Sequence, residues 1–225
     1  MSHPLDRPVW ASLTTRQKPL SQGDDRARRF SAEYGSFAAA ADVSPECLAA
    51  LADLPRDAAG LFLVEAEERP VPPGMAVGFQ AQCCQFLADD VAAHEPDFEV
   101  LTLGDADAPE MLELALMTRP GPFSTATHRL GRFIGVREGG RLVAMAGERM
   151  QPDGFCEVSG VCTHPDHRGR GYAKILSSIV GRRILARGEI PFLHAYETNA
   201  GAIRLYEDLG FRLRATLTVT ILQPA

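Results

Sequence analysis

Long apolar runs are missing from this chain of 225 residues, and none approaches the length of a membrane span. We therefore expect no membrane-spanning helix and no membrane partner. The opening residues, Met-Ser-His-Pro-Leu-Asp-Arg-Pro, lack the apolar core of a secretory signal, so we expect a cytoplasmic protein. An excess of positive charge is also missing, because 23 basic residues stand against 29 acidic ones. A nucleic-acid-binding protein usually has a basic balance, so we expect no nucleic-acid partner.

Cysteine is scarce, and its spacing includes no C-x-x-C pair. The five cysteines are Cys47, Cys83, Cys84, Cys156 and Cys162, an odd number that does not indicate a disulfide framework. Cys83 and Cys84 are adjacent, but a disulfide between neighbours is strained. We expect buried thiols that remain reduced.

Two parts of the chain differ in pattern. Residues 1–96 are rich in Ala, Pro and Asp and have weak hydrophobic periodicity, whereas residues 97–225 show clear helical and strand periods. We predict helices near 26–29, 45–54, 108–117, 172–187 and 199–209. We predict strands at 61–64, 98–103, 133–137, 142–150, 155–163, 192–197 and 212–222.

The most informative segment runs from Val158 to Ala173 and combines a strand, a basic Gly-rich turn and the start of a helix. Backbone N–H groups in the first turn of a helix have no internal partner, and the helix dipole adds partial positive charge there. Glycines allow close approach of a ligand to the backbone, and Arg168 and Arg170 add charge. This segment predicts an anion site suited to a pyrophosphate.

Other ligands fit this segment poorly. A P-loop would need Gly-Lys-Ser/Thr after four intervening residues, which is absent. A dinucleotide fingerprint that starts at Gly169 would need glycine where Lys174 stands, which disfavours a nucleotide-binding oxidoreductase. His164-Pro-Asp-His167 has no further ligands at suitable spacing, so we expect no metal site.

Two motifs in this half resemble those of a known family. Arg168-Gly-Arg-Gly-Tyr-Ala173 resembles the R/Q-x-x-G-x-G/A motif of the GNAT superfamily of acyl-CoA-dependent N-acyltransferases. Ala202-Ile-Arg-Leu-Tyr-Glu-Asp-Leu-Gly-Phe211 resembles its second signature, A-x-x-L-Y-x-x-x-G-F. The resemblance covers about 97–225 and is closest to the branch that includes glycine-N-acyltransferase-like proteins. It implies an α/β or α+β fold with a mixed twisted sheet, helices on both faces and a smaller N-terminal companion region.

The resemblance also implies a set of residues that bind acetyl-CoA. The strand before the turn would splay from its neighbour, with Gly160 easing the distortion, and its backbone would bind the acetyl carbonyl and the pantetheine arm. Asn199 would contact the same arm, although it also fits the N-cap of the next helix. The implied residues are Val161, Cys162, Thr163, Arg168, Gly169, Arg170, Gly171, Tyr172, Ala173, Asn199 and Tyr206.

Catalytic roles follow from the same resemblance. Tyr206 matches the position that often protonates the CoA sulfur, although it could instead be a core residue of an amphipathic helix. Glu157 matches the glutamate base of histone-modifying members. Glu148 and water are alternatives, and each glutamate could equally be a solvated strand residue. Cys162 as a nucleophile would need a partner base and exposure, so we discount that role.

We therefore predict direct transfer of an acetyl group from acetyl-CoA to an amine in a ternary complex. The acceptor would be a small molecule or a peptide, and the acidic balance of the chain favours a cationic one. Residues 1–96 are a candidate degenerate half-domain that shapes the acceptor pocket. The sequence leaves a homodimer as an option, because the sheets of members of the resembled family often pair into dimers. The alternative function is a non-catalytic acyl-CoA-binding regulatory module.

Overall fold

The computed structural model describes residues 3–56 and 59–225. Its strands are β1 (Ser21–Gly23), β2 (Ala27–Phe30), β3 (Ala38–Ala40), β4 (Leu61–Glu65), β5 (Met75–Leu87), β6 (Leu101–Leu103), β7 (Phe133–Glu138), β8 (Arg141–Glu148), β9 (Phe155–Thr163), β10 (Ile190–Tyr196) and β11 (Arg212–Pro224). Its α-helices are α1 (Pro8–Thr14), α2 (Pro45–Asp53), α3 (Ala108–Thr118), α4 (Tyr172–Leu185) and α5 (Ala200–Asp208).

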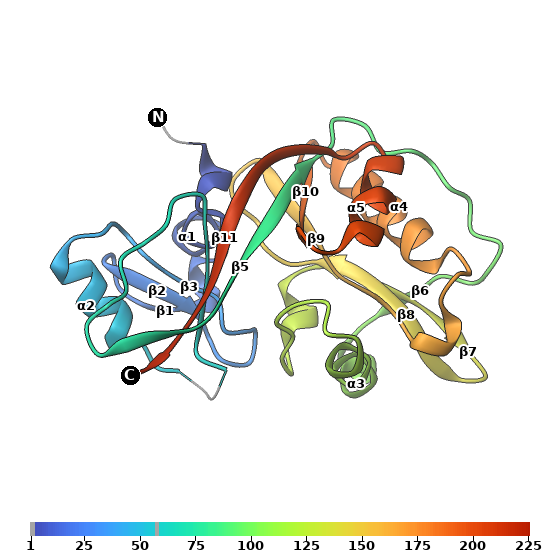
Figure 1. Cartoon of the computed structure of the whole chain (residues 1–225). Coiled ribbons are helices and arrows are strands. Elements are labelled where there is room, and N and C mark those ends of the chain that lie inside the picture. Colours follow the sequence, from blue (N-terminus) through green and yellow to red (C-terminus); the bar gives the residue numbers. More distant parts are fainter. Residues whose placement is uncertain (1–2, 57–58) are drawn as a thin grey trace.

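Eight of these strands form one mixed sheet in the order β4-β11-β5-β10-β9-β8-β7-β6, and β1-β2-β3 form a second sheet (Figure 1). Among the described strands of the large sheet, β9 and β10 pair in parallel and the other neighbours are antiparallel. The fold is therefore α+β with a mixed sheet and a small N-terminal sheet, as the sequence predicts.

Helices α3 and α4 cover opposite faces of the large sheet, and the alternation of β8 explains why. Met145 packs in the cluster that contains Met111 of α3, whereas its neighbours Ala144 and Ala146 pack in the cluster that contains Leu176 of α4. Successive side chains of a strand point to opposite faces of the sheet. An apolar run such as β8 therefore needs a packed layer on each face. The predicted helices on both faces are confirmed.

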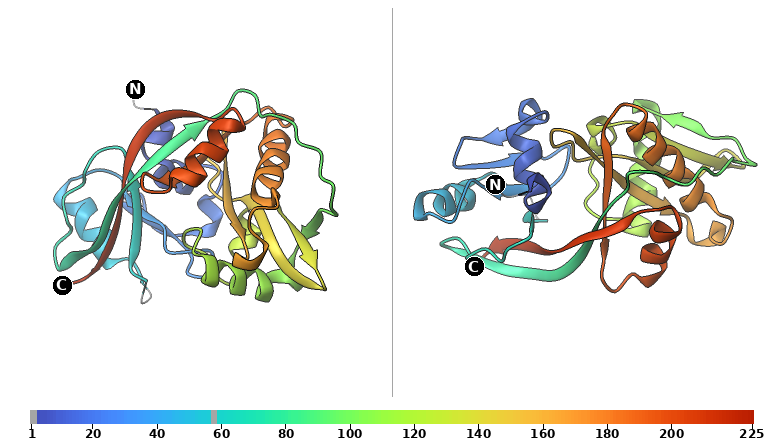
Figure 2. Two further views of the ribbon diagram at one scale, coloured as in Figure 1. Left: turned by 45° about the vertical axis from the view of Figure 1, so that its right-hand side comes forward. Right: turned by 90° about the horizontal axis from the view of Figure 1, so that it is seen from above.

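Strands β5 and β11 form a long twisted ribbon that connects the two ends of the molecule (Figures 1 and 2). At one end β5 pairs with β10, and at the other β11 pairs with β4. The sequence analysis did not predict β5, because its residues 76–80 are exposed and lack the alternation of a half-buried strand. Because β4 and β5 precede residue 97, the large sheet takes strands from both predicted parts of the chain.

The N-terminal region packs directly on this sheet. Phe37 forms an isolated parallel bridge with Phe62 of β4, and the two rings meet edge-to-face at 5.0 Å. The predicted helix at 26–29 is wrong, because Ala27–Phe30 is the central strand of the small sheet and is buried throughout. The predicted helix at 45–54 is confirmed, with the Ser44 side chain accepting from the Cys47 N–H as its N-cap.

Most predicted elements after residue 97 are confirmed to within a few residues, but the strand predicted at 98–103 is limited to Leu101–Leu103 at the sheet edge. Within the described residues, each helix is too short or too polar to cross a lipid bilayer.

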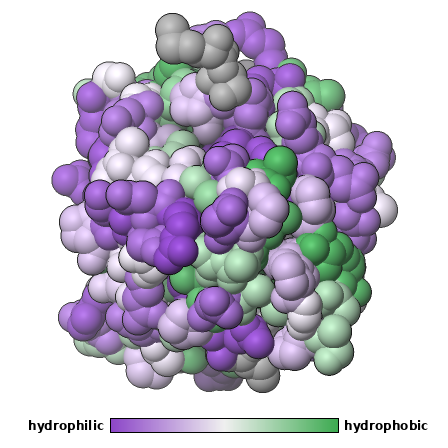
Figure 3. All heavy atoms as spheres, turned by 90° about the vertical axis from the view of Figure 1, so that its left-hand side faces the viewer, coloured by the Kyte–Doolittle hydropathy of each residue, from purple (hydrophilic) through white to green (hydrophobic). Residues whose placement is uncertain are grey.

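The surface on the side of the N-terminal region carries mostly hydrophilic side chains with small hydrophobic patches (Figure 3). All five cysteines are buried and free, as predicted.

Candidate active site

The turn between β9 and α4 forms a cradle of backbone N–H groups. Gly169 and Gly171 adopt φ of +78° and +80°, the left-handed region that glycine enters without strain. Gly171 is the N-cap of α4, and no side chain caps the helix. The first-turn N–H groups are therefore available to a ligand. The lining residues of the adjoining cavity, here called the cradle cavity, include Cys162, Thr163, Arg168, Gly169, Arg170, Gly171, Tyr172 and Ala173.

The two arginines of this turn have different surroundings. Arg168 lines the cradle cavity. Arg170 also lines it, but its Nη1 donates to the carboxylate of Glu138 at 2.9 Å, and the Tyr172 hydroxyl donates to the same carboxylate. The hydrogen bond from Tyr172 and the charge of Arg170 hold the pKa of Glu138 below its usual range. A phosphate at Arg170 would therefore compete with an ionised Glu138.

Strands β9 and β10 separate beside this turn. Their parallel pairing ends at Phe192 and Glu157, after which β10 pairs with β5 alone. On the other side, the register of β9 against β8 shifts in the stretch that contains Gly160, whose φ is +63°. A bulge of this kind bends a strand and redirects its backbone groups. Val161, directly after the bulge, lines the gap.

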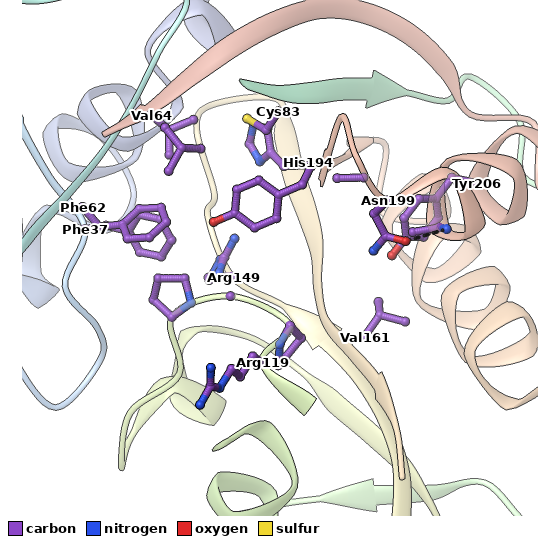
Figure 4. Close-up of a pocket in the computed structure, with 17 residues that line it drawn as sticks. Phe37, Phe62, Val64, Cys83, Arg119, Arg149, Val161, His194, Asn199 and Tyr206 are labelled. Carbon is purple, nitrogen blue, oxygen red and sulfur yellow. Dashed lines mark hydrogen bonds between the residues drawn. The ribbon is translucent and has the colours of Figure 1, made fainter. Parts of the chain in front are cut away.

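Tyr206 and Asn199 line both the cradle cavity and a second cavity. Figure 4 shows the two side chains close together in the second cavity. The Asn199 side-chain oxygen accepts from the Ala202 N–H at 3.2 Å and caps α5, which leaves its amide N–H groups for a ligand. Tyr206 is buried, and burial raises its pKa well above the ordinary value, with smaller contributions from Glu157 and Cys162. Its phenol therefore stays protonated at neutral pH.

The second cavity, called the acceptor cavity after the role proposed for it below, encloses about 750 Å³ including space open to solvent. It extends from Val161 and Tyr206 to the N-terminal region (Figure 4). Its remaining lining residues are Phe37, Phe62, Val64, Cys83, Arg119, Pro120, Gly121, Pro122, Arg149, His194, Ala195, Tyr196, Asn199, Ala202 and Val219.

Glu157 lies beside this cavity but is fully engaged. Arg149 donates to both of its oxygens at 2.8 Å, through Nε and Nη2, and His194 Nδ1 donates to Oε1 at 2.8 Å. Burial alone would raise the pKa of Glu157, but the charge of Arg149 and these hydrogen bonds outweigh it and lower the pKa to about 2. A carboxylate held in this way has little tendency to take a proton.

The imidazole of His194 is held in one tautomer. The Gln85 side-chain nitrogen lies 3.0 Å from His194 Nε2, and the Gln85 oxygen accepts from Arg214. Gln85 therefore donates to Nε2, so the imidazole carries its proton on Nδ1 and donates it to Glu157. A buried polar chain thus runs from Arg214 on β11 to Arg149 at the end of β8.

The other sequence candidates have different surroundings. Glu148 is buried, accepts from Arg187 Nη1 at 2.9 Å and lines neither cavity. Burial raises the pKa of the Cys162 thiol to about 12, which makes it a poor nucleophile. His164 and His167 stack edge-to-face at 5.5 Å. Across residues 3–56 and 59–225, no group of three or more His, Cys, Asp or Glu side chains could hold a metal ion.

Comparison with known proteins identifies the family. A crystal structure of a GNAT-family protein from Novosphingobium aromaticivorans is 48% identical to this chain, covers 100% of both chains and superposes with a TM-score of 0.93. The family model for FR47-like proteins matches residues 133–219. The chain therefore belongs to the GNAT family of acetyltransferases.

Two more distant relatives are a solved structure and a partial sequence match. A GCN5-related N-acetyltransferase from Kribbella flavida is 19% identical, with a TM-score of 0.63 over 96% of this chain and 95% of that one. A mycothiol acetyltransferase from Thermomonospora curvata is 36% identical over 83 residues, which is 36% of this chain. The match spans only 27% of that protein's length.

Sequence reasoning named only Val161, Asn199 and Tyr206 as site residues among the lining residues of the acceptor cavity, and it missed the basic residues Arg119, Arg149 and His194. Arg119 is the C-cap of α3 and the one non-glycine residue with positive φ among the described residues, at 52°. Arg149 and His194 come from separate strands that meet through Glu157. The sequence contains no local signal for that meeting.

Proposed function

We propose that this chain transfers an acetyl group from acetyl-CoA directly to an amine in a ternary complex. The observation that supports this most is the meeting of two cavities at Val161, Asn199 and Tyr206, one built from backbone N–H groups and the other lined by side chains. A donor in the first cavity and an acceptor in the second would be brought together at these residues.

The cradle fits the CoA part of acetyl-CoA, the donor that GNAT acetyltransferases use. The uncapped N-terminus of α4 suits a pyrophosphate. Thr163 Oγ1 is buried in the same wall and has no hydrogen-bond partner among the described residues. We propose that Arg168–Ala173 bind the pyrophosphate and that Val161–Thr163 and Asn199 bind the pantetheine arm.

The proposed chemistry assigns Tyr206 as the acid. The amine nitrogen forms a bond to the acetyl carbon, the carbon–sulfur bond breaks, and the leaving sulfur takes the Tyr206 hydroxyl proton. The amine loses its own proton to water, and water restores the proton of Tyr206. The raised pKa of Tyr206 keeps the proton available before transfer.

We propose water, rather than a carboxylate, as the base. Glu157 accepts hydrogen bonds on both oxygens and has a lowered pKa, and Glu148 is paired with Arg187. Both glutamates were candidates on sequence grounds. Their engaged oxygens favour structural roles, with Glu157 holding Arg149 and His194 in place.

The alternative, a non-catalytic acyl-CoA-binding module, needs only the cradle. The presence of a second cavity that reaches Tyr206 favours the enzyme. The two functions differ in one measurement, the release of free thiol when acetyl-CoA and a library of amines are supplied.

Donor binding is tested by calorimetric titration with acetyl-CoA and CoA, with NAD and ATP as controls. We expect selective micromolar binding that is lost in Gly171→Glu, which places a carboxylate in the cradle and strains a backbone at φ +80°. Gly139→Glu is the matched control, because Gly139 also has positive φ (57°) but lies in the hairpin turn after β7. Absence of binding by acetyl-CoA and longer acyl-CoAs in the folded protein would reject the proposal.

A further inference from the structure

The permanently charged side chains that line the acceptor cavity have one sign. Among the described residues that line it, the permanently charged side chains are Arg119 and Arg149, and none is Asp or Glu. Glu157, the nearest buried carboxylate, is turned toward Arg149 and His194. A purely cationic acceptor such as a polyamine would enter this cavity without a carboxylate to bind it, at a cost in desolvation.

Arg149 presents an unused edge to the cavity. Its Nε and Nη2 atoms bind Glu157, and its Nη1 has no hydrogen-bond partner within the described part of the chain. Nη1 points toward Gly121, where a methyl group would lie 3.4 Å from it. Arginine has five N–H donors, and two bonds to Glu157 leave three for a ligand.

This guanidinium is rigid and poorly hydrated. Its side chain is only 10% exposed, and its central carbon lies 4.5 Å from the centre of the Phe37 ring. The Glu157 carboxylate and the aromatic ring fix its plane from two directions. A carboxylate of the ligand could therefore bind it by charge-assisted hydrogen bonds at little cost in side-chain entropy.

The wall opposite the cradle is apolar. Phe37, Phe62 and Val64 come from the N-terminal region and belong to one buried cluster with Val219 of β11. Figure 4 shows the Phe37 and Phe62 rings on one side of Arg149 and His194 on the other. A ligand carboxylate at Arg149 would therefore place an attached apolar group against these rings.

We propose that the acceptor is a primary amine that also carries a carboxylate and an apolar side group, which is the chemistry of a free apolar amino acid. The carboxylate binds Arg149, the side group packs on Phe37 and Phe62, and the amine faces Val161 and Tyr206. This inference rests on the proposed function and replaces the cationic acceptor that the net charge favours.

The first experiment compares matched amines as acceptors for the wild-type protein. Phenylalanine, leucine and methionine are each compared with their amide and with the corresponding amine that lacks the carboxylate, and spermidine serves as a cationic acceptor. We expect kcat/KM for thiol release to fall about 10- to 100-fold when the carboxylate is lost, the size of a hydrogen bond to a charged group. Equal or better use of amides or spermidine would overturn the proposal while leaving the proposed function intact.

The second experiment tests whether Arg149 binds the carboxylate of the acceptor. The double variant Arg149→Met with Glu157→Gln removes the arginine without leaving Glu157 as an unpaired buried charge. We expect the acid-to-amide ratio of kcat/KM to fall toward one. Glu157→Gln alone measures the separate effect of losing the carboxylate that holds Arg149. Arg212→Met, at an exposed arginine paired with Asp89, should keep the ratio. An unchanged ratio in the double variant would reject the role of Arg149.

A binding measurement keeps the test independent of turnover and of variant stability. N-acetylphenylalanine and its amide are titrated into the wild-type protein saturated with CoA. We expect the acid to bind about 10-fold or more tightly than the amide, and equal affinities would reject the inference. If no amine releases thiol although acetyl-CoA binds, the proposed function fails, and this titration still decides whether the cavity selects a carboxylate.

Discussion

Tyr206 combines burial with a place at the junction of the two cavities, which a core tyrosine would not need. We expect Tyr206→Phe to lower kcat about 100-fold, the usual scale for loss of a general acid, while acetyl-CoA affinity changes little because the ring remains. Tyr34 lines neither cavity, so Tyr34→Phe is the control. A kcat for Tyr206→Phe equal to that of the wild type would remove the acid role.

Glu157 makes stability depend on pH in a defined direction. Its pKa is lowered from 4.5 to about 2 in the folded chain. Its contribution is thus present above about pH 4.5 and is lost as the pH falls toward 2. The shift corresponds to about 3 kcal/mol. Urea unfolding of wild type and Glu157→Gln should differ at pH 7 and converge below pH 3. A constant difference down to pH 2 would contradict this account.

Single residues were predictable where a local motif carried them. Gly169 and Gly171 stand in a sequence that specifies a turn and a helix start, and Asn199 has both the position and the chemistry of an N-cap. Glu157 was chosen by its position in the family pattern, but its hydrogen bonds to Arg149 and His194 depend on strand register. Register is set by the whole sheet, so no local pattern reports it.

At the scale of elements, β9 carries a bulge against β8 in the stretch that contains Gly160, just beyond Glu157, where its pairing with β10 ends. We expect Gly160→Ala to weaken acetyl-CoA binding and lower the unfolding free energy, because a Cβ would lie 2.7 Å from Phe133 and the backbone φ is +63°. Gly139→Ala is a matched control, since its φ is +57° and its Cβ would meet nothing within 4 Å. Calorimetry and urea unfolding measure both effects. Equal losses in the two variants would show that backbone strain alone matters.

Elements were predictable in proportion to their periodicity. Helices α4 and α5 have apolar residues at helical spacing, and strands β8 and β9 are nearly continuous buried runs, so their patterns are clear. β2 contains two consecutive arginines that are nevertheless buried, so its sequence looks polar and does not indicate a buried strand. β5 is exposed along half its length and is held in place by its partners β10 and β11. Long-range pairing of that kind overrides local propensity.

Over the whole molecule, net charge and local charge point in opposite directions. The chain carries −6 overall, yet the acceptor cavity is lined by two arginines and no carboxylate among the described residues. Acidic side chains elsewhere, such as Glu138 and Asp105, are paired with basic groups. The acceptor is therefore better inferred from the cavity lining than from composition.

The large sheet also determines how the chain can be divided. β5 lies between β10 and β11, and the buried cluster around Phe37 joins Leu5 and Phe30 to Phe192 and Leu217. Removing residues 1–96 would expose the edges of β10 and β11 and this cluster to water. We therefore expect residues 97–225 alone to show no cooperative unfolding by circular dichroism. Co-expression with residues 1–96 should restore a folded pair that binds acetyl-CoA, because β4 and β5 can then re-enter the sheet. Cooperative unfolding and acetyl-CoA binding by residues 97–225 alone would instead establish them as an autonomous domain, with the N-terminal region serving only the acceptor.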